Sequence, residues 1–498
     1  MTRVKAAKIL KLKGFVQAFG KDIFKTDGDI IVCKICEKSI TADRKSQIQQ
    51  HVNTDAHQSK LNCLITSGKN QLFLSECDIS DSSKKFNLDL TEAFVAADIS
   101  LCKIDNSILK GFLTKYTNRT IPSESALRKS YLRQCYENSM SKIKEKVVGR
   151  KLWVSIDETT DSCGRKIANC VVGILSENMK ECNSYLINTS VLCSTNANTI
   201  AKFFDESINI FGLRILHKED ILLFVTDAAP YMIKAANGLT ILYPKLMHIT
   251  CLAHALHRVS EEIRRHFPNV DSLIANCKKI FLKAPTRIKK FKEIAPAIPL
   301  PPKPSIIRWG TWLSSAMYYC VNFDIIRDII LELDEDEVIS IGKCKDLIES
   351  ENIRSDLTYI YSSYDFLPLL IKRLEQRNLH LSESIAMYEN TQMNLENAKG
   401  NIANAISQKF DTIMKRNINF KNLQCIAKCL DGSEKMLAEN ISNLSNREIT
   451  CFKFAPVTSC DVERSFSKYK NMLRPNRYQI KDENLHLYTI PYCNVFVE

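Results

Sequence analysis

The sequence predicts an α/β protein, in which a mixed β-sheet core is interrupted by a large all-α insertion and preceded by a small zinc finger and a helical domain. Residues 151–161 and 221–229 each have the pattern of a strand that ends on an aspartate. Residues 259–455 have helical periodicity, and cysteines and histidines near the N-terminus stand at the spacing of zinc ligands. The two strands therefore define the core, and the other regions are arranged around it.

Composition limits the classes of protein that the chain can belong to. With 498 residues, of which 45% are hydrophobic, it can bury several cores, and its length suggests roughly two to four domains. Lys and Arg outnumber Asp and Glu by 69 to 56, which favours a polyanionic partner such as double-stranded DNA, although a soluble surface has the same composition. The 19 cysteines, without a signal peptide, indicate reduced thiols. No apolar run reaches about 18 residues, so we expect no membrane partner. We expect no small-molecule substrate either.

Residues 1–75 form the first predicted region, a basic arm followed by a zinc finger. The arm, residues 1–21, either contacts DNA or is a solvated terminus. A Cys-x2-Cys pair and two later histidines, spaced to hold a tetrahedral Zn²⁺, provide two thiolates and two imidazoles: Cys33, Cys36, His51 and His57. Four protein ligands leave no open position, so the zinc would be structural. Arg44 and Lys45 are candidate DNA contacts.

The next two predicted regions are a linker at 76–89 and a helical domain at 90–150. The linker is polar and without periodicity. In the helical domain, Pro122 stands at a helix start and Ser123 is available to cap it. The residues alone predict only a small helical domain here.

Residues 151–258 read as the first part of the sheet core. After the strand at 151–161, two more strands, a helix, the strand at 221–226, a helix from Pro230 and an apolar segment into His248 follow in that order. This is the order of elements in an RNase H-like sheet. On such a sheet Asp157 and Asp227 occupy adjacent central positions.

Asp157 and Asp227 are the first two candidate catalytic residues. An aspartate at a strand end is often only a cap or turn residue. Side by side, however, two carboxylates can hold a divalent metal against a phosphate. A third carboxylate, Glu463, lies at a predicted helix start, where Thr458 and Asp461 could form a capping box, and it borders an apolar stripe.

Cys251, His254 and His257 fall at i, i+3 and i+6 and would share a face of a helix. A second zinc site is one interpretation, but no further cysteine pair stands at ligand spacing. We favour the other interpretation, in which Cys251 and His254 form hydrogen bonds behind the active site and fix its geometry.

The remaining chain divides into a helical insertion, residues 259–455, and a C-terminal segment, residues 456–498. Amphipathic stretches near 269–283, 313–334, 366–388, 398–416 and 421–442 indicate helices without a catalytic pattern of their own. The Arg308-Trp309 pair is the exception to this absence of a functional pattern, although a lone tryptophan side chain is usually packed in a core. The C-terminal segment carries Glu463 and a run of basic residues. These basic side chains either contact DNA phosphates or lie on the exposed face of a surface helix.

Five motifs in this order resemble those of hAT-superfamily DNA transposases: Asp157 in Asp-Glu-Thr-Thr-Asp, Asp227 in Val-Thr-Asp-Ala-Ala, Cys251-x2-His254, Arg308-Trp309, and Glu463 in Glu-Arg-Ser-Phe-Ser. The resemblance implies an RNase H-like catalytic fold, an Asp-Asp-Glu triad of Asp157, Asp227 and Glu463 with Mg²⁺ or Mn²⁺, and a C-terminal dimerisation region. It places Arg308 and Trp309 near the active site, with the indole stacked on a displaced base. The resemblance also implies that the protein forms a homodimer or a higher homo-oligomer and that it acts in the nucleus.

The N-terminal finger resembles BED-type fingers, and most of all the finger of the CGG triplet-repeat-binding protein. It lacks the leading tryptophan that is usual in the BED pattern.

The expected function is metal-dependent phosphoryl transfer on DNA, that is, cleavage and strand transfer by a transposase. The alternative is a domesticated, catalytically silent DNA-binding transcriptional regulator. A structural chromatin or interaction protein, and an RNase H-like protein that acts on RNA, remain open as well.

Overall fold

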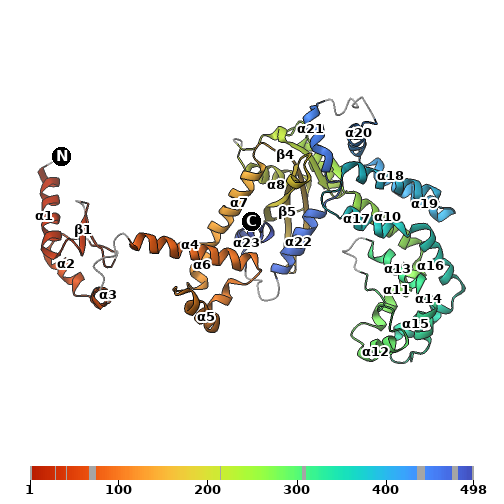
Figure 1. Cartoon of the computed structure of the whole chain (residues 1–498), viewed down its shortest axis with the longest axis horizontal. Helices are drawn as coiled ribbons and strands as arrows, with labels where there is room; N and C mark the ends of the chain where they lie inside the picture. Colours follow the sequence, from red (N-terminus) through yellow and green to blue (C-terminus); the bar gives the residue numbers. More distant parts are fainter. Residues whose placement is uncertain are drawn as a thin grey trace. The chain divides into compact units, whose positions relative to one another are not determined.

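The structure is a computed structural model, and the chain divides into two compact units, Met1–Phe86 and Asn87–Glu498 (Figure 1). The residues that the structure describes are 3–27, 30–36, 38–40, 42–66, 75–212, 215–304, 310–433, 443–473 and 480–495.

The first unit is built on a three-stranded antiparallel sheet in the order β1-β2-β3. A helix precedes the sheet and two helices follow it. Its small core consists of Leu12, Val16, Phe24, Ile31, Cys33, Cys36, Ala42 and Ile48. The elements are α1 (Arg3–Phe19), β1 (Phe24–Thr26), β2 (Ile31–Cys33), β3 (Lys38–Ile40), α2 (Lys45–Val52) and α3 (Asp55–Thr66).

The segment predicted as a linker, 76–89, lies within helix α4 (Ser75–Ala96). The prediction of irregular structure fails because this stretch contains neither Gly nor Pro. In addition, Phe86, Leu90 and Phe94 recur at helical spacing, so the helix expected from residue 90 extends toward the N-terminus.

Short helices follow α4, as the sequence predicts. Ser123 caps α6, since its hydroxyl accepts a hydrogen bond from the backbone N–H of Ala126 at 3.3 Å. Helix α5 contributes no fully buried residue. The elements are η1 (Leu101–Asp105), α5 (Ser107–Thr117), α6 (Glu124–Ser130) and α7 (Leu132–Val147).

The second unit contains a five-stranded mixed sheet with the strand order β6-β5-β4-β7-β8. Strand β4 pairs antiparallel with β5 and parallel with β7; β5 pairs antiparallel with β6, and β7 pairs parallel with β8. The strands match the predicted ones closely: β4 (Lys151–Thr160), β5 (Lys166–Leu175), β6 (Ser184–Val191), β7 (Ile221–Thr226) and β8 (Met247–Thr250).

Helices cover both faces of this sheet. On one face, the amide of Asn169 on β5 donates to Ser465 of helix α22 (Cys460–Met472). Residue Asn188 on β6 pairs with the neighbour of Asn169, so it points to the opposite face, where it donates to Ser207 of helix α8 (Ala197–Asn209). Helix α9 (Pro230–Leu239) packs against α8. The core is therefore a sheet between two helical layers.

Asparagine side chains occupy both edges of the sheet. On β8, the Asn417 amide donates to the Thr250 carbonyl and accepts from the Thr250 N–H, both at 2.9 Å. On β6, Asn494 makes the same pair of bonds to Leu186, at 2.7 and 3.0 Å. Each amide satisfies backbone groups that an edge strand would otherwise leave unpaired.

The helical insertion follows β8. Four of its described helices, α10, α12, α15 and α16, fall outside the predicted amphipathic stretches, and the stretch predicted at 366–388 is divided between α17 and α18. Its helices are α10 (Leu252–His266), α11 (Pro268–Ile280), α12 (Pro285–Ile294), α13 (Thr311–Val321), α14 (Phe323–Leu331), α15 (Ile339–Glu349), α16 (Glu351–Tyr364), α17 (Phe366–Leu374), α18 (Leu381–Asn397), α19 (Asn401–Lys415) and α20 (Phe420–Leu430).

The chain returns to the sheet through α21 (Asn446–Cys451) and η5 (Phe452–Phe454), and then forms α22, η7 (Asp482–Asn484) and α23 (Leu485–Cys493). The predicted capping box of Thr458 and Asp461 is wrong. Ser459 is the N-cap of α22 and makes no side-chain cap bond, because Asp461 instead forms ion pairs with Arg377 at 2.9 Å and Arg464 at 2.6 Å. No helix among the described residues is long and apolar enough to cross a membrane.

Candidate functional site

The four predicted zinc ligands come together in the first unit. Cys33 ends β2, His51 lies on α2 and His57 on α3, so the two histidines come from two helices. One ligand atom from each of Cys33, Cys36, His51 and His57 lies within 4.8 Å of the others. This group of two thiols and two imidazoles could hold a structural zinc ion.

The spacing of the ligand atoms fits tetrahedral zinc. The Nδ1 atom of His57 lies 3.5 Å from the Cys33 sulfur and 3.4 Å from the Cys36 sulfur. Zn–S and Zn–N bonds of ordinary length at a tetrahedral angle place sulfur and nitrogen roughly 3.5 Å apart. The Nε2 atom of His51 is buried without a hydrogen-bond partner among the described residues. Burial, with His57 nearby, lowers the pKa of His51, so its imidazole is neutral and able to coordinate a metal.

The two predicted DNA contacts of this unit are at its surface. Arg44 and Lys45 are both exposed at the start of α2. The Lys45 ammonium lies 5.7 Å from the centre of the Phe19 ring on α1. Both cations can therefore reach a ligand outside the finger.

In the second unit, strand register brings Asp157 and Asp227 next to each other. Ser155 on β4 pairs with Val225 on the parallel strand β7, and each aspartate lies two residues beyond its member of that pair. One oxygen of each carboxylate accepts a backbone N–H: Asp157 from Glu158 at 2.8 Å, and Asp227 from Ala229 at 3.1 Å. The other oxygen of each carboxylate takes no part in these backbone hydrogen bonds.

Helix α22 brings Glu463 to the same place, within hydrogen-bonding contact of Asp157. The pKa of Asp157 lies well above its ordinary value because the carboxyl group is shielded from solvent and because the Glu463 and Asp227 carboxylates are close to it. Closely spaced acids that oppose each other's ionisation are characteristic of a site for a cation.

The three carboxylates are more widely spaced than the zinc ligands. Among the described residues, only the zinc group has all of its ligand atoms within 4.8 Å of one another. The contact within the triad is thus between Asp157 and Glu463, with Asp227 beside them. The remaining aspartate of the strand motif, Asp161, has another role: it accepts from Arg165 at 2.7 Å and from Tyr469 at 3.0 Å, which closes the β4–β5 turn.

Cys251 and His254 lie against the start of α22. The Cys251 sulfur accepts from the Ser459 N–H at 3.2 Å, and His254 Nδ1 lies 3.4 Å from the Ser459 hydroxyl. His254 Nε2 is 3.7 Å from the Glu463 carboxylate. Burial alone would lower the pKa of His254, but Cys251 and Glu463 outweigh it and raise the pKa. His254 can therefore hold a positive charge beside Glu463.

The sequence analysis does not predict a role for two further residues near the site, Glu158 and Asn169. Glu158 points to the opposite sheet face from Asp157, where its carboxylate accepts from the Tyr231 hydroxyl at the start of α9. Asn169 stands beside Asp157 on β5. The signal for Asn169 is visible in the sequence, because it is a lone amide in an otherwise apolar strand.

Arg308 and Trp309 lie outside the described residues. The next tryptophan in the sequence, Trp312 on α13, is buried, and its indole N–H donates to Asp271 at 3.0 Å.

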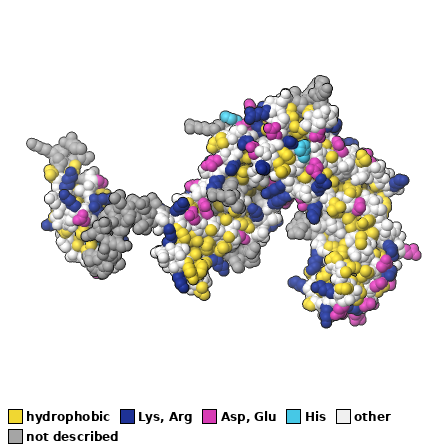
Figure 2. All heavy atoms as spheres, in the orientation of Figure 1, with side chains coloured by type: hydrophobic (Ala, Val, Ile, Leu, Met, Phe, Trp, Pro, Cys, Tyr) yellow, Lys and Arg dark blue, Asp and Glu magenta, His cyan; other side chains and the backbone are white. Residues whose placement is uncertain are grey.

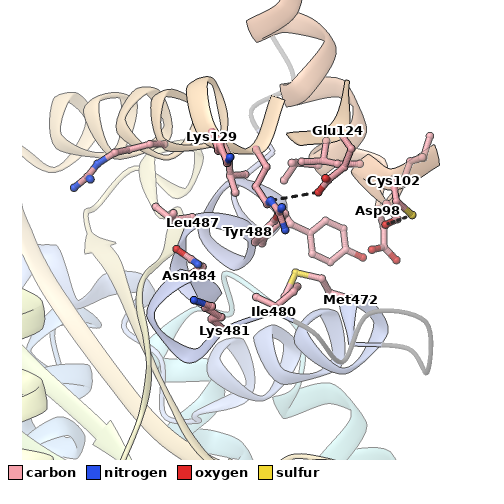
Figure 3. A pocket seen from close by; sticks show the side chains of 18 residues that line it. Asp98, Cys102, Glu124, Lys129, Met472, Ile480, Lys481, Asn484, Leu487 and Tyr488 are labelled. Atoms are coloured by element: carbon pink, nitrogen blue, oxygen red, sulfur yellow. Dashed lines mark hydrogen bonds and ion pairs between the residues drawn. The ribbon is translucent and has the colours of Figure 1, made fainter. Parts of the chain in front are cut away.

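A pocket of ≈ 600 Å³ lies apart from the carboxylates, between η1, α6 and α7 on one side and η7 and α23 on the other (Figure 3). Lys129, Lys481 and Tyr488 are among the side chains that line it, together with Met472 and Leu487 (Figure 3). None of the predicted catalytic residues lines this pocket. The pocket lies between the helical segment and the C-terminal segment, and it is separate from the candidate site.

Two family models match the chain. Residues 122–280 match a domain of unknown function, DUF659, a transposase-like domain of the hAT type, and this stretch contains the sheet with Asp157 and Asp227. Over these residues the chain is similar to that domain. Residues 8–62 match the CGGBP1 N-terminal domain, and this stretch contains all four zinc-site residues. Comparison with curated proteins gives no match.

Proposed function

We propose that this protein is a hAT-like DNA transposase that cleaves and joins double-stranded DNA with a divalent metal at Asp157, Asp227 and Glu463. The observation that carries the proposal is the convergence of three distant carboxylates: β4 and β7 bring the two aspartates together, and α22 brings Glu463 into contact with Asp157. The DUF659 match over 122–280 supports the same class.

The sheet supports an RNase H-like core. Three antiparallel strands followed by two parallel ones, in the order β6-β5-β4-β7-β8, is the arrangement of that fold. In it, acidic residues at the ends of the two central parallel strands bind metal. When bound, Mg²⁺ or Mn²⁺ activates water or a 3′-hydroxyl and neutralises charge on the phosphate. Asp157 and Asp227 would bind the cation, Glu463 would complete the site, and His254 would orient Glu463.

The finger would bind DNA in the nucleus, with zinc holding its fold and with Arg44 and Lys45 at the interface. The match to the CGGBP1 N-terminal domain supports this role. Contacts of these cations with phosphates would make the binding dependent on salt.

Strand cleavage of labelled DNA in Mn²⁺ tests the proposal, with the element's own terminal repeats as substrate. We expect the wild type to cut, and Asp157→Ala, Asp227→Ala and Glu463→Ala each to fall below about 1% of wild-type cleavage while still binding DNA. Glu206→Ala, which removes an exposed carboxylate on α8, is the control and should cut normally. If no protein cuts and all bind DNA equally, the protein is the DNA-binding regulator.

A homodimer is also part of the proposal, and α5 offers a surface for it. Ile108, Phe112 and Tyr116 are 82%, 56% and 68% exposed and recur every fourth residue along one face. Figure 2 shows hydrophobic side chains gathered over this helix. An exposed apolar face of this kind is typical of an interface with another chain.

Replacing Phe112 with Asp should therefore favour the monomer. A charge on the apolar stripe would be buried unpaired in the dimer, so we expect the dimer dissociation constant to rise at least about 10-fold in sedimentation velocity. Thr114→Asp adds the same charge to the opposite side of α5 and is the matched control. Equal effects of the two variants would exclude this face as the dimer contact.

A further inference from the structure

A row of three polar residues crosses the sheet beneath α22. Asp157 on β4 pairs with Asn169 on β5, and Asn169 pairs with Thr189 on β6. Directly paired residues of antiparallel strands point to the same face, so all three side chains face α22. Asn169 is 0% and Thr189 3% exposed. The row therefore leads from the candidate catalytic aspartate into the apolar interior.

Asn169 is the member of this row that is bonded to the helix. Its Nδ2 donates to the hydroxyl of Ser465 at 2.7 Å, and this hydroxyl donates in turn to the carbonyl of Val462 at 2.6 Å. That carbonyl belongs to the peptide bond that joins Val462 to Glu463. The chain of bonds thus runs from the strand next to Asp157 to the backbone that carries Glu463.

Packing alone does not call for an amide at this position. Burying a polar group costs free energy unless its hydrogen bonds are made, whereas an apolar residue of similar shape is nearly neutral. Asn169 Oδ1 and Thr189 Oγ1 are both buried without a partner among the described residues, so the row carries that cost. What the amide supplies in return is a directional bond, which fixes the helix along and around its axis where an apolar contact lets it slide.

We propose that Asn169 is a positioning residue, which holds α22 through Ser465 so that the Glu463 carboxylate stands against Asp157. The assignment rests on the proposed function only in naming the reaction that this arrangement serves. Asn169 is fully buried, and the role assigned to it is exerted through the helix.

The test compares variants that differ in whether they break the bond to α22. Asn169→Leu removes the bond from the strand side at similar volume, and Ser465→Ala removes it from the helix side with the smaller perturbation. Thr189→Val is the matched control, because it changes a buried polar residue of the same row that has no bond to the helix. All are made in the full chain.

The first measurement is metal-free. Thermal unfolding of Asp157→Asn, Glu463→Gln and the double variant gives the coupling energy between the two carboxyl groups. We expect this coupling to be present in the wild type, to be retained in Thr189→Val, and to be more than halved in Asn169→Leu and Ser465→Ala. Equal coupling in all four backgrounds, or none in the wild type, would overturn the proposal.

The second measurement is Mn²⁺ binding by calorimetry. Loss of a residue that orients a metal ligand typically weakens affinity about 10- to 100-fold, and we expect Asn169→Leu and Ser465→Ala to lose at least about 10-fold and Thr189→Val to lose none. Unchanged affinity in Asn169→Leu would count against the positioning role. A wild type that binds no Mn²⁺ would count against the metal site of the proposed function, while the metal-free coupling still decides the role of Asn169.

Discussion

Removal of zinc by a strong chelator is expected to unfold residues 1–86 and to leave residues 87–498 folded. Among its described residues, the first unit buries eight hydrophobic residues in its core, and two of them, Cys33 and Cys36, are proposed ligands. A core of that size does not sustain a fold without a metal or disulfides, and zinc binding in small fingers contributes roughly 10–16 kcal/mol to folding. Metal and fold should therefore be lost together.

Cys36→Ser should have the same result without a chelator, because it removes one of the two thiolates. Cys102→Ser is the control, since Cys102 is an exposed thiol outside the group. Amide NMR spectra of the full chain would report each unit separately. Persistence of the dispersed signals of β1–β3 in chelator would contradict a structural zinc. Because the cysteine thiols must lose their protons and the histidines must be neutral to bind zinc, affinity should also fall as the pH is lowered.

The sheet could be predicted from the sequence because its strands are governed by local pattern. Ile221 to Val225 is apolar throughout and lies in a fully buried strand, and the alternation after Lys151 gives β4. The positions of Asp157 and Asp227 then follow from parallel pairing. The four zinc-site residues were found for a similar reason, since ligand spacing within a short finger is itself local.

Features that depend on contacts across the fold were not predictable. The sequence pattern predicts Asp461 as a capping residue. In the fold, its carboxylate instead forms ion pairs with Arg377, which follows α17, and with Arg464 of its own helix. Asn417 and Asn494 close the sheet edges from segments far away in sequence, and nothing local distinguishes them from solvated asparagines. The role we propose for Asn169 likewise requires knowing which helix lies above β5.

The largest loss of stability in the second unit is expected from Glu448→Ala. Glu448, on α21, has a side chain that is only 5% exposed, and it forms ion pairs with Lys151 and Lys245, each at 2.9 Å. Lys151 begins β4 and Lys245 precedes β8, so this carboxylate ties the return of the chain from the insertion to two strands of the sheet. Removing it leaves the partly buried Lys245 ammonium without this partner and leaves Lys151 with Asp220 alone, at 3.0 Å, which costs about 3–5 kcal/mol.

The exposed pair between Arg150 and Glu181 is the matched control. It also involves the start of β4, but its side chains are 46% and 36% exposed. Solvent screens such a pair, so Glu181→Ala should cost at most about 1 kcal/mol. Equal losses in the two variants, measured by thermal unfolding of the full chain, would show that the burial of Glu448 does not matter.

The pH dependence of the Glu448 effect follows from its pKa. Burial alone would raise this pKa, but hydrogen bonds from Lys151, from the Ser445 backbone and from Lys245 outweigh burial and lower it to about 2, against 4.5 for a free glutamate. A carboxyl group with a lowered pKa contributes its full stability above pH 4.5 and loses it as the pH falls toward 2. The stability gap between wild type and Glu448→Gln should therefore be constant from pH 7 to about 5 and close below that. A gap that stayed constant down to pH 2 would mean that the ion pairs do not supply it.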